Sequence, residues 1–207
     1  TKLYGRACKI CDKYLVFVGR FGGVIILSIL IFPALQNRRK LNTPKTFYQD
    51  GVEYVTWVRG YANGSDAPDT NPQVVTSKEA TNLKIYIYIY NMSYAEGAFT
   101  TDTKVNLSYF NYLGVDTSLH TSRFPDRSAC YLVLSSDKTG DISVYDYRWQ
   151  HLQGIADGPL DYRSYNTYDI RNITGWYYIR LHLSVTGYKG VIDSELKIHK
   201  VIGLINI

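Results

Sequence analysis

The chain has 207 residues, enough for about one domain, and a formal net charge of +5. The charge is unevenly placed: residues 1–45 hold nine Lys/Arg and the single acid Asp12, whereas residues 46–207 hold fourteen Lys/Arg and seventeen Asp/Glu. A domain that binds nucleic acid carries its basic patch on the folded part. This distribution argues against nucleic acid as a partner and favours an anionic membrane surface near the N-terminal segment.

The only long apolar run of the chain extends from Tyr14 to Leu35, and Arg20 is its only charge. A bilayer core needs about 20 helical residues, and Arg20 lies close enough to the N-terminal end for its side chain to reach the headgroups. The stretch "FPALQNRRK" is a poor signal-peptidase site. We therefore predict one transmembrane helix acting as a signal anchor, with this division of the chain: a short basic segment 1–13, the span 14–35, a linker 36–47 and a domain 48–207.

Basic residues flank the predicted span on both sides, so the positive-inside rule is nearly balanced. Four N-glycosylation sequons break the balance, at Asn63, Asn91, Asn106 and Asn172, and all of them follow the span. We predict that these four residues carry glycans. The short N-terminal segment is then cytoplasmic, and the C-terminal domain is extracellular or lumenal, at the plasma membrane or an endomembrane.

Two of the three cysteines, Cys8 and Cys11, form a C-x-x-C motif just before the span. A structural zinc site needs a second pair of ligands, and a redox C-x-x-C expects a βαβ pattern; the sequence has neither. The pair is either a juxtamembrane palmitoylation site or two reduced thiols. Cys130 is the only cysteine after the span, so no disulfide forms within the domain.

Several runs after the linker alternate apolar and polar residues in the manner of β-strands. Leu83–Met92 ("LKIYIYIYNM") sets Leu83 and three isoleucines against Lys84 and three tyrosines, and Trp176–Thr186 ("WYYIRLHLSVT") is equally regular. Lys104–Leu113 ("KVNLSYFNYL") follows the same pattern, with Val105, Leu107 and Tyr109 on one face. Shorter candidates are "VEYVTWV", "CYLVLS", "DISVYDY" and "SELKIHKVI", and one stretch, Tyr147–Gly158, resembles a short helix.

These runs predict an all-β fold: an antiparallel β-sandwich of about seven strands after the N-terminal transmembrane helix. Eighteen of the 20 tyrosines lie in the domain, where most of them suit half-buried pleated surfaces. Tyr86, Tyr88 and Tyr90 differ, because the opposite face of their strand is wholly aliphatic. Either this is a central strand, or its tyrosine face is a contact surface.

Signals for catalysis are weak. The four histidines lack metal-ligand spacing, and no P-loop, G-x-S-x-G elbow or G-x-G-x-x-G motif is present. Asp157 and Asp161, in "IADGPLDYRS", are expected to shape a turn rather than to form a pair of catalytic carboxylates. We predict no enzyme activity, no catalytic residues, no metal and no cofactor.

The order of a cysteine pair, one span and a β-sandwich resembles the plant late-embryogenesis-abundant group 2 domain proteins, which include the hairpin-induced-like membrane proteins. The stretches that carry the resemblance are "LKIYIYIYN", "VNLSYFNYLG" and "WYYIRLHLSVTGYKG". Where that family commonly has Asn-Pro-Asn, this chain has Asn91-Met92-Ser93. The resemblance implies a membrane glycoprotein linked to stress or defence, without catalysis.

We therefore expect a single-pass type II membrane glycoprotein that presents a non-catalytic β-sandwich for binding. Its partners are the lipid bilayer and either another protein or further copies of itself. One alternative is an accessory subunit of a larger membrane complex. A second alternative is a self-assembling surface protein that uses strand-edge contacts.

Overall fold

The structure is a computed structural model that describes residues 44–91, 94–122, 127–138, 143–152, 160–187 and 190–205. The predicted segment 1–13, the span 14–35, most of the linker, and Cys8 and Cys11 lie outside these residues. Within the described ranges, no helix is long and apolar enough to cross a membrane. The first strand begins at Lys45, so it includes the last residues of the segment predicted to be a linker.

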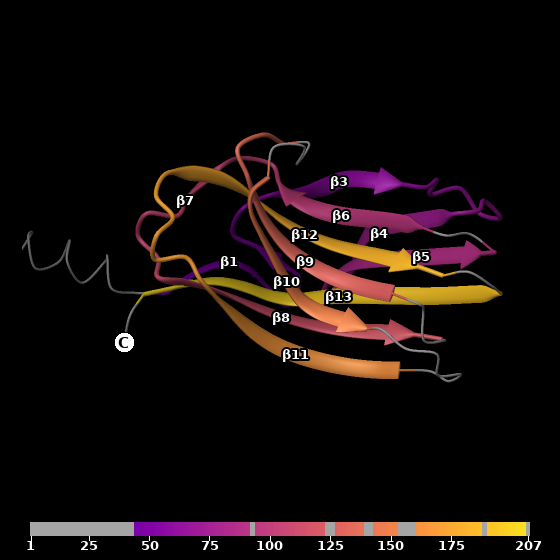
Figure 1. Cartoon of the computed structure of the whole chain (residues 1–207). Coiled ribbons are helices and arrows are strands. Elements are labelled where there is room, and N and C mark those ends of the chain that lie inside the picture. The colour runs from indigo at the N-terminus through magenta and orange to yellow at the C-terminus, as the bar shows by residue number, and fades with distance from the viewer. Residues whose placement is uncertain are drawn as a thin grey trace, which may run out of the picture. The chain divides into compact units, whose positions relative to one another are not determined.

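The described residues form an all-β antiparallel sandwich, as predicted, but with thirteen strands rather than about seven. Seven strands form sheet A (Figure 1): β1 (Lys45–Gln49), β2 (Val52–Glu53), β4 (Gln73–Lys78), β5 (Leu83–Tyr90), β8 (Tyr112–Thr121), β11 (Leu160–Asp169) and β13 (Val191–Leu204). Six form sheet B: β3 (Trp57–Asn63), β6 (Ala95–Thr101), β7 (Val105–Asn106), β9 (Arg127–Ser135), β10 (Ser143–Leu152) and β12 (Trp176–Thr186).

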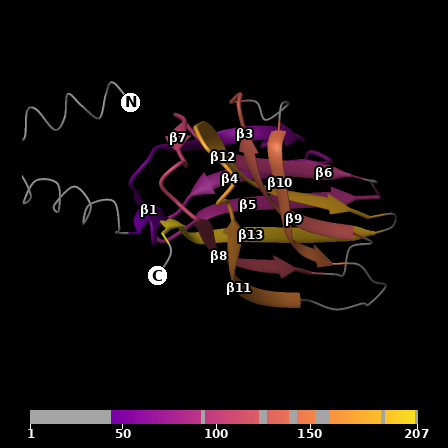
Figure 2. The same cartoon turned by 60° about the vertical axis from the view of Figure 1, so that its left-hand side comes forward.

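The longest strand, β13, organises sheet A. One of its edges pairs with β8, and its other edge pairs with β5 along the first half and with β1 near the end. Both views show β13 between β5 and β8 (Figures 1 and 2). β4 extends the sheet beyond β5, and β11 extends it beyond β8. β5 is therefore an interior strand, which confirms one of the two expectations for its tyrosine face.

The core lies between the two sheets. Ile85, Ile87 and Ile89 of β5 are at most 1% exposed, and Leu181 and Leu183 of β12 are fully buried. The alternation predicted from the sequence for these two strands is confirmed, because every second side chain faces the opposite sheet. Cys130 is also buried in this core and is a free thiol.

Three local predictions were wrong. The run Lys104–Leu113 is not one strand: β7 ends at Asn106, and the amide of Phe110 donates to the carbonyl of Leu107 in a turn before β8. Residues 147–152, predicted as the start of a helix, belong to β10. Asp161, expected in a turn, lies in β11.

Candidate binding face

The outer face of sheet A carries polar side chains in rows that cross the strands. Strand register places Tyr86 of β5 opposite Glu195 of β13, Glu195 opposite His120 of β8, and His120 opposite Asp161 of β11. Residues directly opposite each other in antiparallel strands project from the same face with their Cβ atoms about 5 Å apart. One row of four side chains therefore spans four strands.

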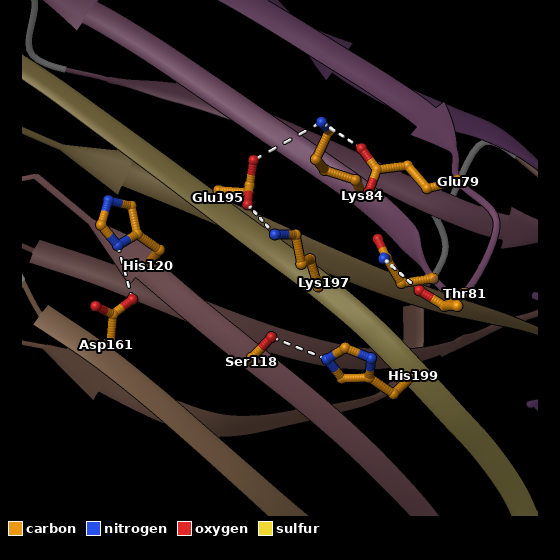
Figure 3. A network of polar contacts seen from close by, with 10 residues as sticks. Glu79, Thr81, Lys84, Ser118, His120, Asp161, Glu195, Lys197 and His199 are labelled. Atoms are coloured by element: carbon orange, nitrogen blue, oxygen red, sulfur yellow. Dashed lines mark hydrogen bonds and ion pairs between the residues drawn. The ribbon is translucent and has the colours of Figure 1, made fainter. Parts of the chain in front are cut away.

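A second row runs beside the first and contains two lysines. Lys84 lies opposite Lys197, which lies opposite Ser118. Glu195 separates the two ammonium groups: its Oε1 is 2.7 Å from Nζ of Lys197 and its Oε2 is 3.8 Å from Nζ of Lys84 (Figure 3). Lys84 also contacts Glu79, and this hydrogen bond raises the pKa of Lys84 and lowers the pKa of Glu79. The cations of this row are balanced by carboxylates.

Between β8, β11 and β13 the outer face is hollowed into a depression of about 320 Å³. His120 and Asp161 line it and are joined by a contact of 2.7 Å between Nδ1 and Oδ1 (Figure 3). Arg163 lines it too, and holds Asp116 through two hydrogen bonds of 3.0 and 3.3 Å. Side chains that donate and side chains that accept hydrogen bonds thus converge on one hollow.

Ser118 and His199 lie beside this depression and form a contact of 2.9 Å between Oγ and Nε2 (Figure 3). Burial lowers the pKa of His199, with the Arg163 guanidinium as the next contribution. A serine and a neutral histidine at this distance are two of the three members of a hydrolytic triad. The third is missing from the described residues, because no carboxylate accepts a hydrogen bond from the other ring nitrogen of His199.

The tyrosine ladder of β5 lies on the same outer face, next to the polar rows. Tyr86 and Tyr88 are half-buried, whereas Tyr90 is 50% exposed beside Val191, its cross-strand partner. The Tyr86 phenol donates to Oδ1 of Asp193 over 2.5 Å. Burial raises the pKa of Tyr86, and the Asp193 carboxylate adds to the effect.

The four sequon asparagines all lie in described residues and at the surface. Asn63 ends β3, Asn91 follows β5, and Asn172 lies in the turn before β12; all three are exposed. Asn106 in β7 is half-buried. Asn106 is therefore the most enclosed of the four.

The outer face of sheet B carries a separate aromatic and charged cluster. Tyr94 donates to the Glu96 carboxylate, and Nε2 of His182 lies 3.1 Å from the same oxygen, close enough for an ion pair but poorly directed for a hydrogen bond. The rings of Tyr131 and His182 lie with 5.4 Å between their centroids and are tilted by 32° to each other. Burial acts to raise the pKa of Glu96, but His182 and Tyr94 outweigh it and the net shift is downward. The Glu96 carboxylate thus has two partners within this cluster.

Among the described residues, no group of three His, Cys, Asp or Glu side chains is arranged to hold a metal ion. The contact between His120 and Asp161 joins residues 41 positions apart and was missed by the sequence analysis. The available signal was the polar side of β11, where Asp161 and Arg163 alternate with Tyr162 in a strand that has few aliphatic residues.

No family model matches the chain, and no curated protein matches it. Solved structures are similar at low identity. The family 11 carbohydrate-binding module from Clostridium thermocellum is 10% identical, with a TM-score of 0.38 over 79% of this chain and 98% of that one. The adhesin domain of Lys-gingipain from Porphyromonas gingivalis W83 is 10% identical, with a TM-score of 0.40 over 80% and 99%.

The enzymatically active domain of tailspike protein 4 from bacteriophage CBA120 is 15% identical, with a TM-score of 0.37 over 72% of this chain. The present chain spans about a fifth of that tailspike chain. At these identities and TM-scores the resemblance extends to the β-sandwich arrangement and no further.

Proposed function

We propose that this β-sandwich is a non-catalytic binding domain whose ligand is a neutral saccharide held in the depression on sheet A. One observation supports this most directly. Side chains that donate and side chains that accept hydrogen bonds line a single hollow on the outer face of sheet A. Recognition sites for small polar ligands orient the ligand with a few convergent polar groups.

A saccharide suits this combination because each hydroxyl both donates and accepts a hydrogen bond, while the C–H face of the ring is apolar. The carboxylates of Asp161 and Glu195 would accept, and the Arg163 and Lys197 side chains would donate. Two fixed cations and two carboxylates balance, so the hollow has no strong preference for a charged ligand.

The absence of catalysis belongs to the same proposal. Ser118 and His199 form a nucleophile–base contact, but the described residues supply no carboxylate to orient the imidazole. In a triad, that third group holds the base in the correct tautomer and stabilises its charged form. We expect Ser118 to have the reactivity of an ordinary surface serine.

The setting of the domain is proposed from the sequence. The apolar run from Tyr14 to Leu35 would anchor the chain in a bilayer, and the four sequons favour an extracellular or lumenal domain. The family resemblance adds a role in stress or defence, and the juxtamembrane position of Cys8 and Cys11 favours their acylation. A domain displayed in this way would meet glycans of a wall, a matrix or another cell.

The direct test is a screen of the full chain in detergent against a glycan array, followed by calorimetric titration of the best ligand. Asp161→Asn and Glu195→Gln should each weaken binding about tenfold or more, which is about 1.4 kcal/mol. Asp66→Asn is the matched control, because Asp66 is also an exposed carboxylate with one basic partner and lies outside the depression. Equal losses in all three variants, or no glycan bound, would contradict the proposal.

Self-association is the second candidate, and strand β11 favours it. This ten-residue strand pairs with β8 on one side, and no described strand pairs with its other edge. Free edges accept strands from other copies. Sedimentation of the full chain in mild detergent separates the cases: a homo-oligomer supports self-association, and a stable heteromer supports an accessory subunit. A monomer that binds glycan supports the first proposal.

A further inference from the structure

Trp176 is an anomaly of the surface. Its side chain is 60% exposed at the first position of β12, whereas Trp57, at the start of β3, is fully buried. An indole is among the largest apolar groups that a protein can bury, and its exposure usually marks a contact. The residue lies in sheet B and takes no part in the depression on sheet A.

The residue opposite Trp176 is a sequon asparagine. Strand β7 pairs with the start of β12, and the register places Asn106 opposite Trp176 and Val105 opposite Tyr177. Directly opposite side chains project from the same face, with Cβ atoms about 5 Å apart. A group attached to the amide of Asn106 therefore begins next to the indole.

Local hydrogen bonds hold the Asn106 side chain in a defined orientation. Its Oδ1 accepts from the amide of Ser108 over 3.0 Å, and Oγ of Ser108 accepts from the amide of Gly175 over 2.8 Å. The amide of Leu107 also donates to the carbonyl of Gly175. With its oxygen engaged in this turn, Asn106 has no described partner for Nδ2, the atom to which a glycan is attached.

We propose that Asn106 carries an N-linked glycan and that its first sugar packs against the Trp176 indole. This inference rests on the extracellular or lumenal location given under the proposed function. The transfer forms a bond from Nδ2 to the anomeric carbon of a diphosphate-linked lipid oligosaccharide. It breaks the bond between that carbon and the diphosphate oxygen, and Nδ2 loses one proton.

The other three sequons lack this arrangement. Asn63 lies opposite Glu96 in the pairing of β3 with β6, so its cross-strand neighbour is a carboxylate. Oδ1 of Asn91 accepts from the amide of Gly190 outside any strand pair. Asn172 lies in a turn. Of the four, Asn106 alone has an aromatic ring directly opposite it in a strand register, so its glycan becomes part of the folded surface.

The test uses the full chain produced in cells that glycosylate secreted proteins, with Asn63→Gln, Asn91→Gln and Asn172→Gln combined so that only the Asn106 sequon remains. Mass spectrometry of the glycopeptide measures occupancy. Thermal unfolding is then followed with the intact glycan, with the glycan trimmed to one sugar, and with the glycan removed. We expect trimming to leave Tm unchanged and complete removal to lower it by about 2–4 °C.

Trp176→Ala is made in the same background, and the four combinations of ring and sugar form a double-mutant cycle. Enzymatic removal of the glycan also converts the Asn106 side-chain amide to a carboxylate. This conversion occurs both with and without the Trp176 ring, so its effect cancels in the cycle. We expect the sugar-dependent difference in Tm to vanish in Trp176→Ala. It should return in part in Trp176→Tyr, because that variant retains an aromatic ring. Trp176→Tyr also provides the test if Trp176→Ala fails to fold. A difference that persists in Trp176→Ala would overturn the inference, because the contact would then lie elsewhere.

Glycan occupancy measured in the chain that retains all four sequons distinguishes this inference from the extracellular or lumenal location on which it rests. Glycans at Asn63 or Asn172 with Asn106 unmodified would overturn the inference and leave the location intact. An unmodified chain at all four positions would overturn both.

Discussion

The phenol of Tyr86 on β5 donates a hydrogen bond to Oδ1 of Asp193 on β13, with 2.5 Å between the oxygens. Asp193 is not directly opposite Tyr86; its cross-strand partner is Tyr88. The bond is therefore a diagonal contact between neighbouring strands, within reach because tyrosine is long. It ties the tyrosine ladder to the strand that organises sheet A.

Removing this hydroxyl should destabilise the domain. Tyr86→Phe keeps the ring and leaves the Asp193 carboxylate without its donor, and a hydrogen bond to a charged group contributes about 1.5–3 kcal/mol. Denaturant unfolding should show that loss in the free energy of unfolding. Tyr90→Phe is the control, since Tyr90 is exposed and in the same ladder. Equal effects for the two variants would show that the contact with Asp193 contributes nothing.

Stability should fall at alkaline pH. Burial raises the pKa of Tyr86, and it also raises the pKa of Tyr168 and of the Cys130 thiol. Each group keeps its proton more tightly in the folded protein than in the unfolded chain, so its contribution is complete below the unfolded value and declines as the pH rises above it. Unfolding free energies measured from pH 8 to 11 should decrease, and less steeply in Tyr86→Phe. A flat profile would contradict the raised pKa values.

The Glu96 carboxylate should matter at the opposite end of the pH range. Burial acts to raise its pKa, but the contacts with His182 and Tyr94 lower it overall. The contribution is therefore present above the unfolded value, about 4.5, and is lost as the pH falls below it. Glu96→Gln should reduce stability at pH 7 by about 1–3 kcal/mol and flatten the acid decline. If the free energies of unfolding of the parent chain and of Glu96→Gln differ by the same amount at every pH from 3 to 7, the lowered pKa of Glu96 is contradicted.

Gly97 lies where the two sheets approach closely. A Cβ added there would be 2.6 Å from Cγ1 of Val74 and 3.0 Å from Cγ2 of Ile85, both in sheet A. Overpacking of this kind typically costs about 1–3 kcal/mol, so Gly97→Val should lower the denaturation midpoint. Val74→Ala removes the nearest obstacle, and the double variant should recover part of the loss beyond the sum of the single effects. If the effects of Gly97→Val and Val74→Ala simply add, the overpacking does not arise from contact with Val74.

Ser118 should not react as a catalytic nucleophile. A fluorophosphonate probe labels serines activated by an oriented base, and the described contact of Ser118 with His199 lacks the orienting group. Intact mass after incubation should show no adduct, with a serine hydrolase in the same tube as positive control. An adduct that disappears in Ser118→Ala would show an active nucleophile and overturn the non-catalytic proposal.

The sandwich class could be predicted because two strands display their role in their own residues. The isoleucines of β5 and the aliphatic residues of β12 alternate with polar residues, and the period of two is a property of the strand itself. β11, which the sequence analysis missed, carries no such pattern. β11 has Tyr168 as a buried residue but otherwise presents polar and exposed side chains, because an edge strand buries little on either face.

The candidate site could be predicted only in part. The tyrosines of β5 stood out because their strand was aliphatic on its other side. The depression could not be predicted, because His120 and Asp161 belong to strands whose pairing depends on the whole sheet.

The amino-acid sequence by itself determined the fold class, the absence of an internal disulfide and the inward faces of the two most regular strands, since each follows from local periodicity or composition. The tertiary structure alone decided the register, and register placed Glu195 beside His120 and Asn106 beside Trp176. Neighbours across a sheet are chosen by hydrogen-bonded pairing between distant segments, and a shift of one residue would turn each of these side chains to the other face.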